Sequence, residues 1–207
     1  MVCRIESLKG RDYLHMYQIR KQSAETSTEE YLKQYVDMEA ITANCRNCPN
    51  YNTRWSCPPH NFDVEKFWTS FHTLHLSCVQ IVYDSDVVQQ AYAKEGLSEI
   101  LHNSLDYEKR QLRERLEARL HQLPGSAALA SGCCELCSDC ARRSNLPCRY
   151  PCHMHYSIES LGGDVVKTAR NFFGIELQWM GGNRLPEYFT LIGGILFHPE
   201  PRSEISD

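Results

Sequence analysis

Residues 131–155, SGCCELCSDCARRSNLPCRYPCHMH, hold six of the chain's eleven cysteines and two of its nine histidines. A chain of 207 residues is long enough to bury an ordinary core, so disulfides are not required for it to fold. In a reducing cytosol, closely spaced cysteines indicate a metal site or a catalytic thiol. This segment constrains the fold strongly, because loops around it have to gather several thiols at one place.

The apolar runs and the net charge of the chain exclude several classes of protein. The N-terminal sequence MVCRIESLKGRDYLH has no apolar stretch of signal-peptide length, and no run approaches the roughly 18 apolar residues of a membrane span. The net charge is −4 and Lys and Arg form no long cluster, which argues against a general nucleic-acid surface. We therefore expect a soluble cytoplasmic protein whose partners include neither nucleic acid nor a membrane.

Hydrophobic patterns predict a single α/β domain over residues 1–207. A capping-box signature predicts a helix over 23–45 that leads into Cys45, and a leucine stripe predicts the longest helix over 98–122. Shorter helices are expected at 62–71 and 157–173, and strands at 12–20, 73–84, 126–132, 175–180 and 188–197. The order strand, long helix, strand indicates a βαβ-like core: a mixed sheet with flanking helices, the last strand central, and cysteine-rich metal loops at 45–59 and 132–155.

The later cysteine group has the spacing of an iron-sulfur site. Cys134, Cys137 and Cys140 are each separated by two residues, and Cys148 follows after seven more. Bacterial ferredoxins use tandem C-x2-C-x2-C to hold a [4Fe-4S] cluster, whereas tetrahedral zinc usually takes two separate C-x2-C hairpins. The spacing favours a cluster, with zinc as the alternative.

The earlier group is Cys45-x2-Cys48-x8-Cys57, followed by two prolines that stiffen the loop. Three cysteines leave one iron of a second cluster without an obvious ligand. Four residues elsewhere in the chain are candidates for the missing ligand: Cys3, Cys133, Cys152 and His60. If none of them binds, the open iron would act as a Lewis acid that takes a small substrate.

Other candidate residues have ordinary interpretations. Cys78 lies in an apolar strand pattern and is expected to be a buried small hydrophobe. His153 and His155 are expected to be surface or packing residues rather than ligands. Three loop arginines are able to offset the negative charge of a cluster, although a solvated loop position is the expectation for each: Arg142, Arg143 and Arg149.

Two segments together resemble a known family. CRNCPNYNTRWSCPP at 45–59 and GCCELCSDCARRSNLPCRYPCHMHYSIESLGGDV at 132–165 are similar to the cysteine-rich predicted metal-binding proteins of anaerobic bacteria and archaea, domain of unknown function 2284. The resemblance covers most of the chain and implies metal binding without a defined reaction. Carried over by position, it implies these ligands: Cys45, Cys48, Cys57, Cys134, Cys137, Cys140 and Cys148.

The chain departs from the family pattern at two positions. Cys133 stands where the pattern has proline, and Cys152 stands where a residue that does not bind metal is expected. Either cysteine is a candidate additional ligand.

Three functions follow from these patterns. The first is an iron-sulfur protein with one or two [4Fe-4S] clusters that transfers electrons in anaerobic metabolism, with a redox partner protein. The second is an enzyme whose open cluster iron binds a small-molecule substrate, in dehydratase or desulfidase chemistry. The third is a zinc-binding interaction module. Catalytic residues and the oligomeric state are not defined by the sequence.

Overall fold

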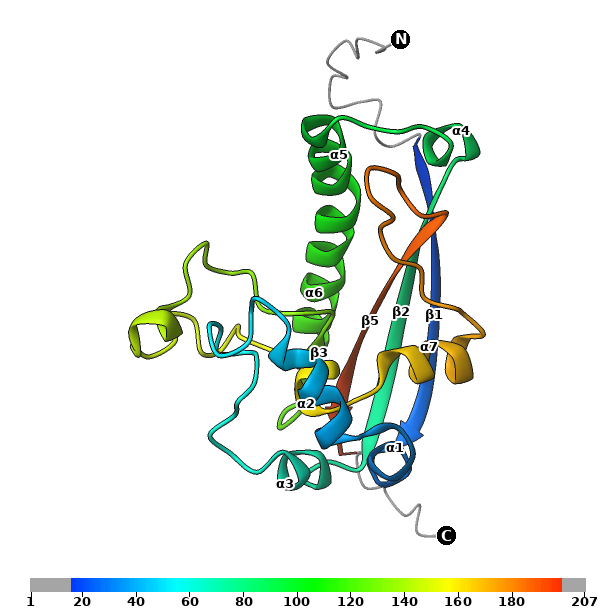
Figure 1. Cartoon of the computed structure of the whole chain (residues 1–207). Helices are drawn as coiled ribbons and strands as arrows, with labels where there is room; N and C mark the ends of the chain where they lie inside the picture. Colours follow the sequence, from blue (N-terminus) through cyan, green and yellow to red (C-terminus); the bar gives the residue numbers. More distant parts are fainter. Residues whose placement is uncertain (1–15, 199–207) are drawn as a thin grey trace, which may run out of the picture.

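A five-stranded sheet with helices on both faces forms the body of the molecule (Figure 1). The computed structural model describes residues 16–198. The strand order is β1-β2-β5-β3-β4. The bounds are β1 (Tyr17–Ser27), β2 (Thr73–Tyr83), β3 (Ala127–Ala130), β4 (Tyr156–Ser157) and β5 (Tyr188–Phe197). The mixed α/β sheet predicted from the sequence is confirmed, and β5 is a central strand, also as predicted.

The long helix connects two strands that run in the same direction. β5 is antiparallel to both β2 and β3, so β2 and β3 are parallel to each other with β5 between them. β4 pairs with β3 in parallel. The βαβ-like order is therefore present, but its two strands are neighbours of β5 rather than of each other.

Seven α-helices lie in the described residues: α1 (Thr28–Tyr35), α2 (Met38–Arg46), α3 (Val64–Thr69), α4 (Ser85–Val88), α5 (Lys94–Leu101), α6 (Tyr107–Leu120) and α7 (Val165–Phe173). A π-helical turn, His102–Asp106, joins α5 to α6. The predicted long helix is confirmed as this continuous α5–α6 unit. No helix among residues 16–198 is long and apolar enough to cross a membrane.

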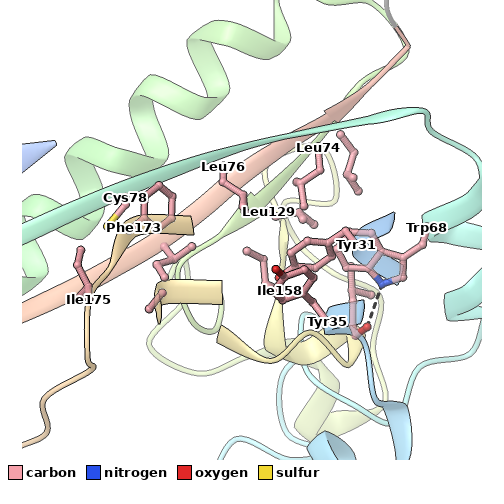
Figure 2. Packing of buried hydrophobic residues seen from close by; sticks show 14 of the residues in the cluster. Tyr31, Tyr35, Trp68, Leu74, Leu76, Cys78, Leu129, Ile158, Phe173 and Ile175 are labelled. Carbon is pink, nitrogen blue, oxygen red and sulfur yellow. Dashed lines mark hydrogen bonds between the residues drawn. The ribbon is translucent and has the colours of Figure 1, made fainter. Parts of the chain in front are cut away.

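Residues that alternate along the strands point to opposite faces of the sheet and pack into two separate hydrophobic cores. Along β2, Leu74, Leu76 and Cys78 face α1, α3 and α7, whereas Val79 and Ile81 face the α5–α6 unit. In the first core the indole Nε1 of Trp68 donates a hydrogen bond to the carbonyl of Leu161 at 3.0 Å. Figure 2 shows Cys78 packed beside Phe173, in the role predicted for this cysteine. Burial of both sheet faces leaves the cysteine loops outside the cores.

The helix predicted over 23–45 is two helices preceded by a strand. β1 continues to Ser27, whose hydroxyl accepts a hydrogen bond from the N–H of Glu30 and caps α1. The chain then breaks at Val36, which forms an isolated bridge with Gly163, and Asp37 caps α2. The capping residue was detectable, but the break depends on a pairing with a distant part of the chain.

Three other predicted elements differ from the structure. The predicted strand 12–20 overlaps only the start of β1, and its first four residues lie outside the described part. The predicted strand 175–180 is irregular: Ile175 packs in the core, but Gly174, at a φ of 66°, turns the chain out of α7 and no strand among the described residues pairs with it. The helix predicted from 157 begins at Val165, because Asp164 caps it through the N–H of Lys167.

The two cysteine-rich loops lie beside each other at one side of the molecule. The first joins α2 to α3, and the second joins β3 to β4. Figure 1 shows them as the cyan and yellow-green segments that project beyond β3.

Candidate metal centre

The first cysteine loop starts in the last turn of α2. Asp37 caps this helix, which places Cys45 near the helix end. The N–H of Cys48 donates to the carbonyl of Cys45 at 2.9 Å and closes the next turn. Cys57 follows a turn in which its N–H donates to the carbonyl of Arg54 at 3.0 Å. The loop thus folds back so that its three cysteines lie on neighbouring turns.

The thiols of this loop are close enough to influence one another. Burial raises the pKa of Cys45, and the neighbouring Cys48 and Glu159 raise it further. The carboxyl of Glu159 is itself buried, and its Oε2 has no hydrogen-bond partner among the described residues. A metal bound by Cys45 and Cys48 would relieve the repulsion between the two thiolates.

Cys133 from the second loop joins the first group. The side-chain amide of Asn50 donates to Cys133 Sγ at 3.4 Å. The hydroxyl of Ser56 accepts a hydrogen bond from the N–H of Cys134 at 2.9 Å, which holds the start of the second loop against Cys57. We name Cys45, Cys48, Cys57 and Cys133 the first group.

Cys133 is more acidic than Cys57. Its hydrogen bond with Cys57 lowers the pKa of Cys133 to about 6, and the cations of Lys109 and Arg54 lower it too. The same hydrogen bond, together with burial, raises the pKa of Cys57. A lowered pKa favours the thiolate, which is the form of cysteine that binds a metal.

The second group consists of Cys134, Cys137, Cys140 and Cys148, which all line one small cavity. Burial raises the pKa of Cys134, and the charges of the other three cysteines of the group raise it further. The structure therefore brings together all four ligands that sequence spacing predicted for this site. Trp55, Tyr150 and Met154 line the same cavity and limit its contact with water.

Arg142, which lies in the second cysteine loop, donates hydrogen bonds to the backbone of the first loop. Its guanidinium donates to the carbonyls of Arg54 at 2.9 Å and of Cys57 at 2.6 Å, and also to the carbonyl of Pro59 at 2.6 Å. The guanidinium carbon lies 5.1 Å from the centre of the Trp55 ring. The expectation of a solvated loop position was wrong for Arg142, because its hydrogen bonds go to the backbone of the other loop.

Arg54 makes the reciprocal connection. Its Nη1 donates to the carbonyl of Cys134 at 2.8 Å, and its Nε donates to the side chain of Asn50 at 3.0 Å. Sequence reasoning missed Arg54, Asn50 and Ser56. The only signal available was their position between Cys48 and Cys57, in a loop with little apolar character.

The remaining candidates differ in their surroundings: His60 lines a pocket together with Cys148, and His153 lines a cleft together with Cys133 and Cys134. Cys152 and His153 are exposed, and Cys3 lies outside the described residues. The Nε2 of His60 is hydrogen-bonded to the carbonyl of Ser160 at 2.6 Å. Of the four candidates for a fourth ligand, Cys133 is the one that the described structure places against the first group.

The described residues contain no set of three or more His, Cys, Asp or Glu side chains close enough to hold a single metal ion. The cysteines of both groups are free thiols in the described structure. As donors, they form two sets of four soft thiols with no carboxylate or imidazole, and such sets suit zinc and iron-sulfur clusters.

Comparison with known proteins agrees with the donor chemistry. No curated protein and no solved structure matched the chain. The family model described as "Predicted metal-binding protein (DUF2284)" matches residues 32–197, a span that includes both cysteine groups. The chain therefore belongs to this family of predicted metal-binding proteins.

Proposed function

We propose that the protein holds two [4Fe-4S] clusters and transfers electrons to or from a redox partner protein. The first group would bind one cluster, and the second group would bind the other. The observation that carries the proposal is the second group, in which four cysteines with ferredoxin-type spacing line one small cavity.

Iron-sulfur chemistry fits this donor set better than zinc. A tetrahedral zinc ion needs all four sulfurs about 2.3 Å from one point. In a cubane each thiolate binds a different iron, so the sulfurs stand further apart. The tandem two-residue spacing of Cys134, Cys137 and Cys140 is the spacing used for such clusters and supports the second arrangement.

Once bound, such a cluster supplies one-electron transfer, and the chain's own residues tune it. Four thiolates and a cluster carry net negative charge, which nearby cations and N–H donors stabilise. Arg54 and Lys109 lie close to Cys133, and Arg142 is hydrogen-bonded to the backbone of Cys57. These cations would raise the reduction potential of the first centre.

The position of Cys133 favours an electron carrier over an enzyme with an open cluster iron. Dehydratase-type chemistry needs one iron without a protein ligand. The thiol of Cys133 lies beside that of Cys57, which lowers the pKa of Cys133 and makes it a candidate fourth ligand for the first centre. A fourth thiolate there would close the centre.

Metal analysis of protein prepared without oxygen tests the proposal. We expect about eight iron and eight labile sulfide per chain, together with an electron paramagnetic resonance signal of two interacting reduced clusters. A colourless protein with stoichiometric zinc and no labile sulfide would overturn it. Adding small ligands should leave the spectrum of both clusters unchanged, because neither centre has an open iron.

A further inference from the structure

A cleft of about 510 Å³ lies between the α5–α6 unit and the start of the second cysteine loop. Cys133 and Cys134, one residue from each group, both line it. The opposite wall is a stripe of α6 that contains Lys109 and Arg113, four residues apart and hence on one helix face. The cleft is therefore next to both cysteine groups.

Two arginines of the cleft are free to bind a ligand. Lys109 is held by Glu135, with 2.6 Å between Nζ and Oε1. Arg110 and Arg113 also line the cleft, and neither forms an ion pair or a side-chain hydrogen bond with any residue in the described part of the chain. A guanidinium without a protein partner presents a fork of donors that fits a carboxylate or a phosphate.

The charges of the cleft favour an anion. Three permanent cations line it, Lys109, Arg110 and Arg113, against two carboxylates, Asp106 and Glu135. The guanidinium groups of Arg110 and Arg113 face a cavity partly screened from water, where Coulomb attraction is stronger than at an open surface.

His155 adds a buried imidazole whose ion-pair contact is with Glu117. Its side chain is only 9 % exposed, and it lines the cleft. Nε2 lies 3.4 Å from Glu117 Oε1, but the orientation makes no hydrogen bond and neither atom has another partner among the described residues. A buried polar atom of this kind is costly unless something binds it.

The helix is also irregular at the cleft. The π-helical turn His102–Asp106 lies at its rim and supplies two of its lining residues, His102 and Asp106. A π-turn gives up regular helical hydrogen bonding, and such turns occur frequently at functional sites. This observation is independent of the charges.

We propose that the cleft binds a small oxyanion, namely a metabolite that carries a phosphate or carboxylate group, against Cys133 and Cys134. Arg110 and Arg113 bind its charge, and His155 contacts its uncharged part or a second oxygen. The site goes beyond electron transfer between proteins, because it places a small molecule beside both cysteine groups. Its binding groups are side chains of the protein and do not include a metal.

Isothermal titration calorimetry of the metal-loaded protein, prepared without oxygen in low-salt buffer, tests the site with inorganic phosphate and with succinate. At least one of the two should bind saturably with one site per chain, and the tighter one identifies the group recognised. Arg113→Gln should weaken that binding about tenfold or more, since it removes charged hydrogen bonds. The matched control is Arg115→Gln, an exposed arginine of the same helix that lies outside the cleft. Its affinity should change less than twofold.

The site is refuted if neither anion binds saturably, if Arg113→Gln has no effect, or if both variants weaken binding equally. Circular dichroism checks folding, and Arg110→Gln replaces Arg113→Gln if the latter does not fold. Iron and sulfide are measured on the same samples. Anion binding without iron would refute the cluster proposal alone, and iron without anion binding would refute the cleft alone.

Discussion

Cys133 and Cys134 share a peptide bond but lie in different cysteine groups. Cys133 accepts a hydrogen bond from Asn50 and shares another with Cys57. Cys134 lines the cavity of the second group, and its N–H is bound by Ser56. One peptide bond therefore joins the two cysteine groups, and metal centres bound by both of them would be near neighbours.

Replacing Cys133 should remove one cluster and leave the other. Cys133→Ala takes the fourth thiolate from the first group, so iron and labile sulfide should fall to about half of the parent values. Cys152→Ala is the matched control, because Cys152 is an exposed cysteine of the same loop that does not line the cavity of the second group. Chemical analysis of both variants checks this prediction. Equal loss in the two variants, or no loss in Cys133→Ala, would show that Cys133 is not a ligand.

Removing the clamp between the loops should destabilise both groups. Arg142→Ala deletes hydrogen bonds to the backbone carbonyls of Arg54 and Cys57, which are part-buried, and should lower the free energy of unfolding by about 2 kcal/mol. Arg143→Ala is the neighbouring control: this arginine lies 3.5 Å from Asp139 in an exposed ion pair and should change stability by less than about 0.5 kcal/mol.

Thermal denaturation followed at the visible absorbance of the clusters compares the two arginine variants. The clamp would be contradicted by an Arg142→Ala protein that melts with the parent.

A methyl group added to the centre of β5 should disturb the sheet. A Cβ at Gly193 would lie 2.7 Å from the carbonyl oxygen of Leu129, a backbone atom that cannot rotate away. We expect Gly193→Ala to destabilise the protein by about 1–3 kcal/mol. Gly181→Ala is the control, because nothing lies within 4 Å of a Cβ there. Urea denaturation of both variants gives the difference.

Stability should fall above pH 10 because of buried tyrosines. Burial raises the pKa of Tyr83 to about 12, and its hydroxyl is 2.5 Å from that of Ser104. In the unfolded chain tyrosine loses its proton near pH 10. Between pH 10 and about 12 the unfolded state therefore binds fewer protons than the folded state, and the free energy of unfolding decreases as pH rises.

The raised pKa of Tyr83 stabilises the folded state by about 2 kcal/mol. This stabilisation is fully present below pH 10 and is lost as the pH rises further. Tyr83→Phe should flatten the pH dependence over this range, whatever it does to stability at neutral pH. Urea denaturation at a series of alkaline pH values measures the slope. An unchanged slope in the variant would mean that Tyr83 ionises at its ordinary pKa in the folded protein.

Local patterns predicted the elements whose determinants are local. The leucine stripe of the α5–α6 unit, the apolar runs of β2 and β5, and the short helix α3 all lie where the sequence placed them. The break at Val36 was not predictable, because it depends on the backbone of Gly163. The strand expected at 175–180 was wrong for a similar reason. Its apolar residues pack in the core, but no strand among the described residues pairs with it.

The candidate site shows the same difference between features with local determinants and features that depend on distant parts of the chain. Ferredoxin-type spacing predicted which four cysteines line one cavity, because tandem two-residue gaps determine local geometry. The choice among Cys3, Cys133, Cys152 and His60 for the other group needed the fold, since it depends on how two loops pack together. Arg54 and Arg142 escaped prediction because each binds the backbone of a loop far away in the chain.

The division of the first group between distant segments has a consequence for biosynthesis. Three of its cysteines are translated early, but the fourth emerges only after the whole α5–α6 unit has left the ribosome. A nascent chain that ends before residue 133 would offer an incomplete binding set to any cofactor-delivery machinery. Maturation of this centre would then have to follow synthesis of the second loop, and the two centres would be assembled together.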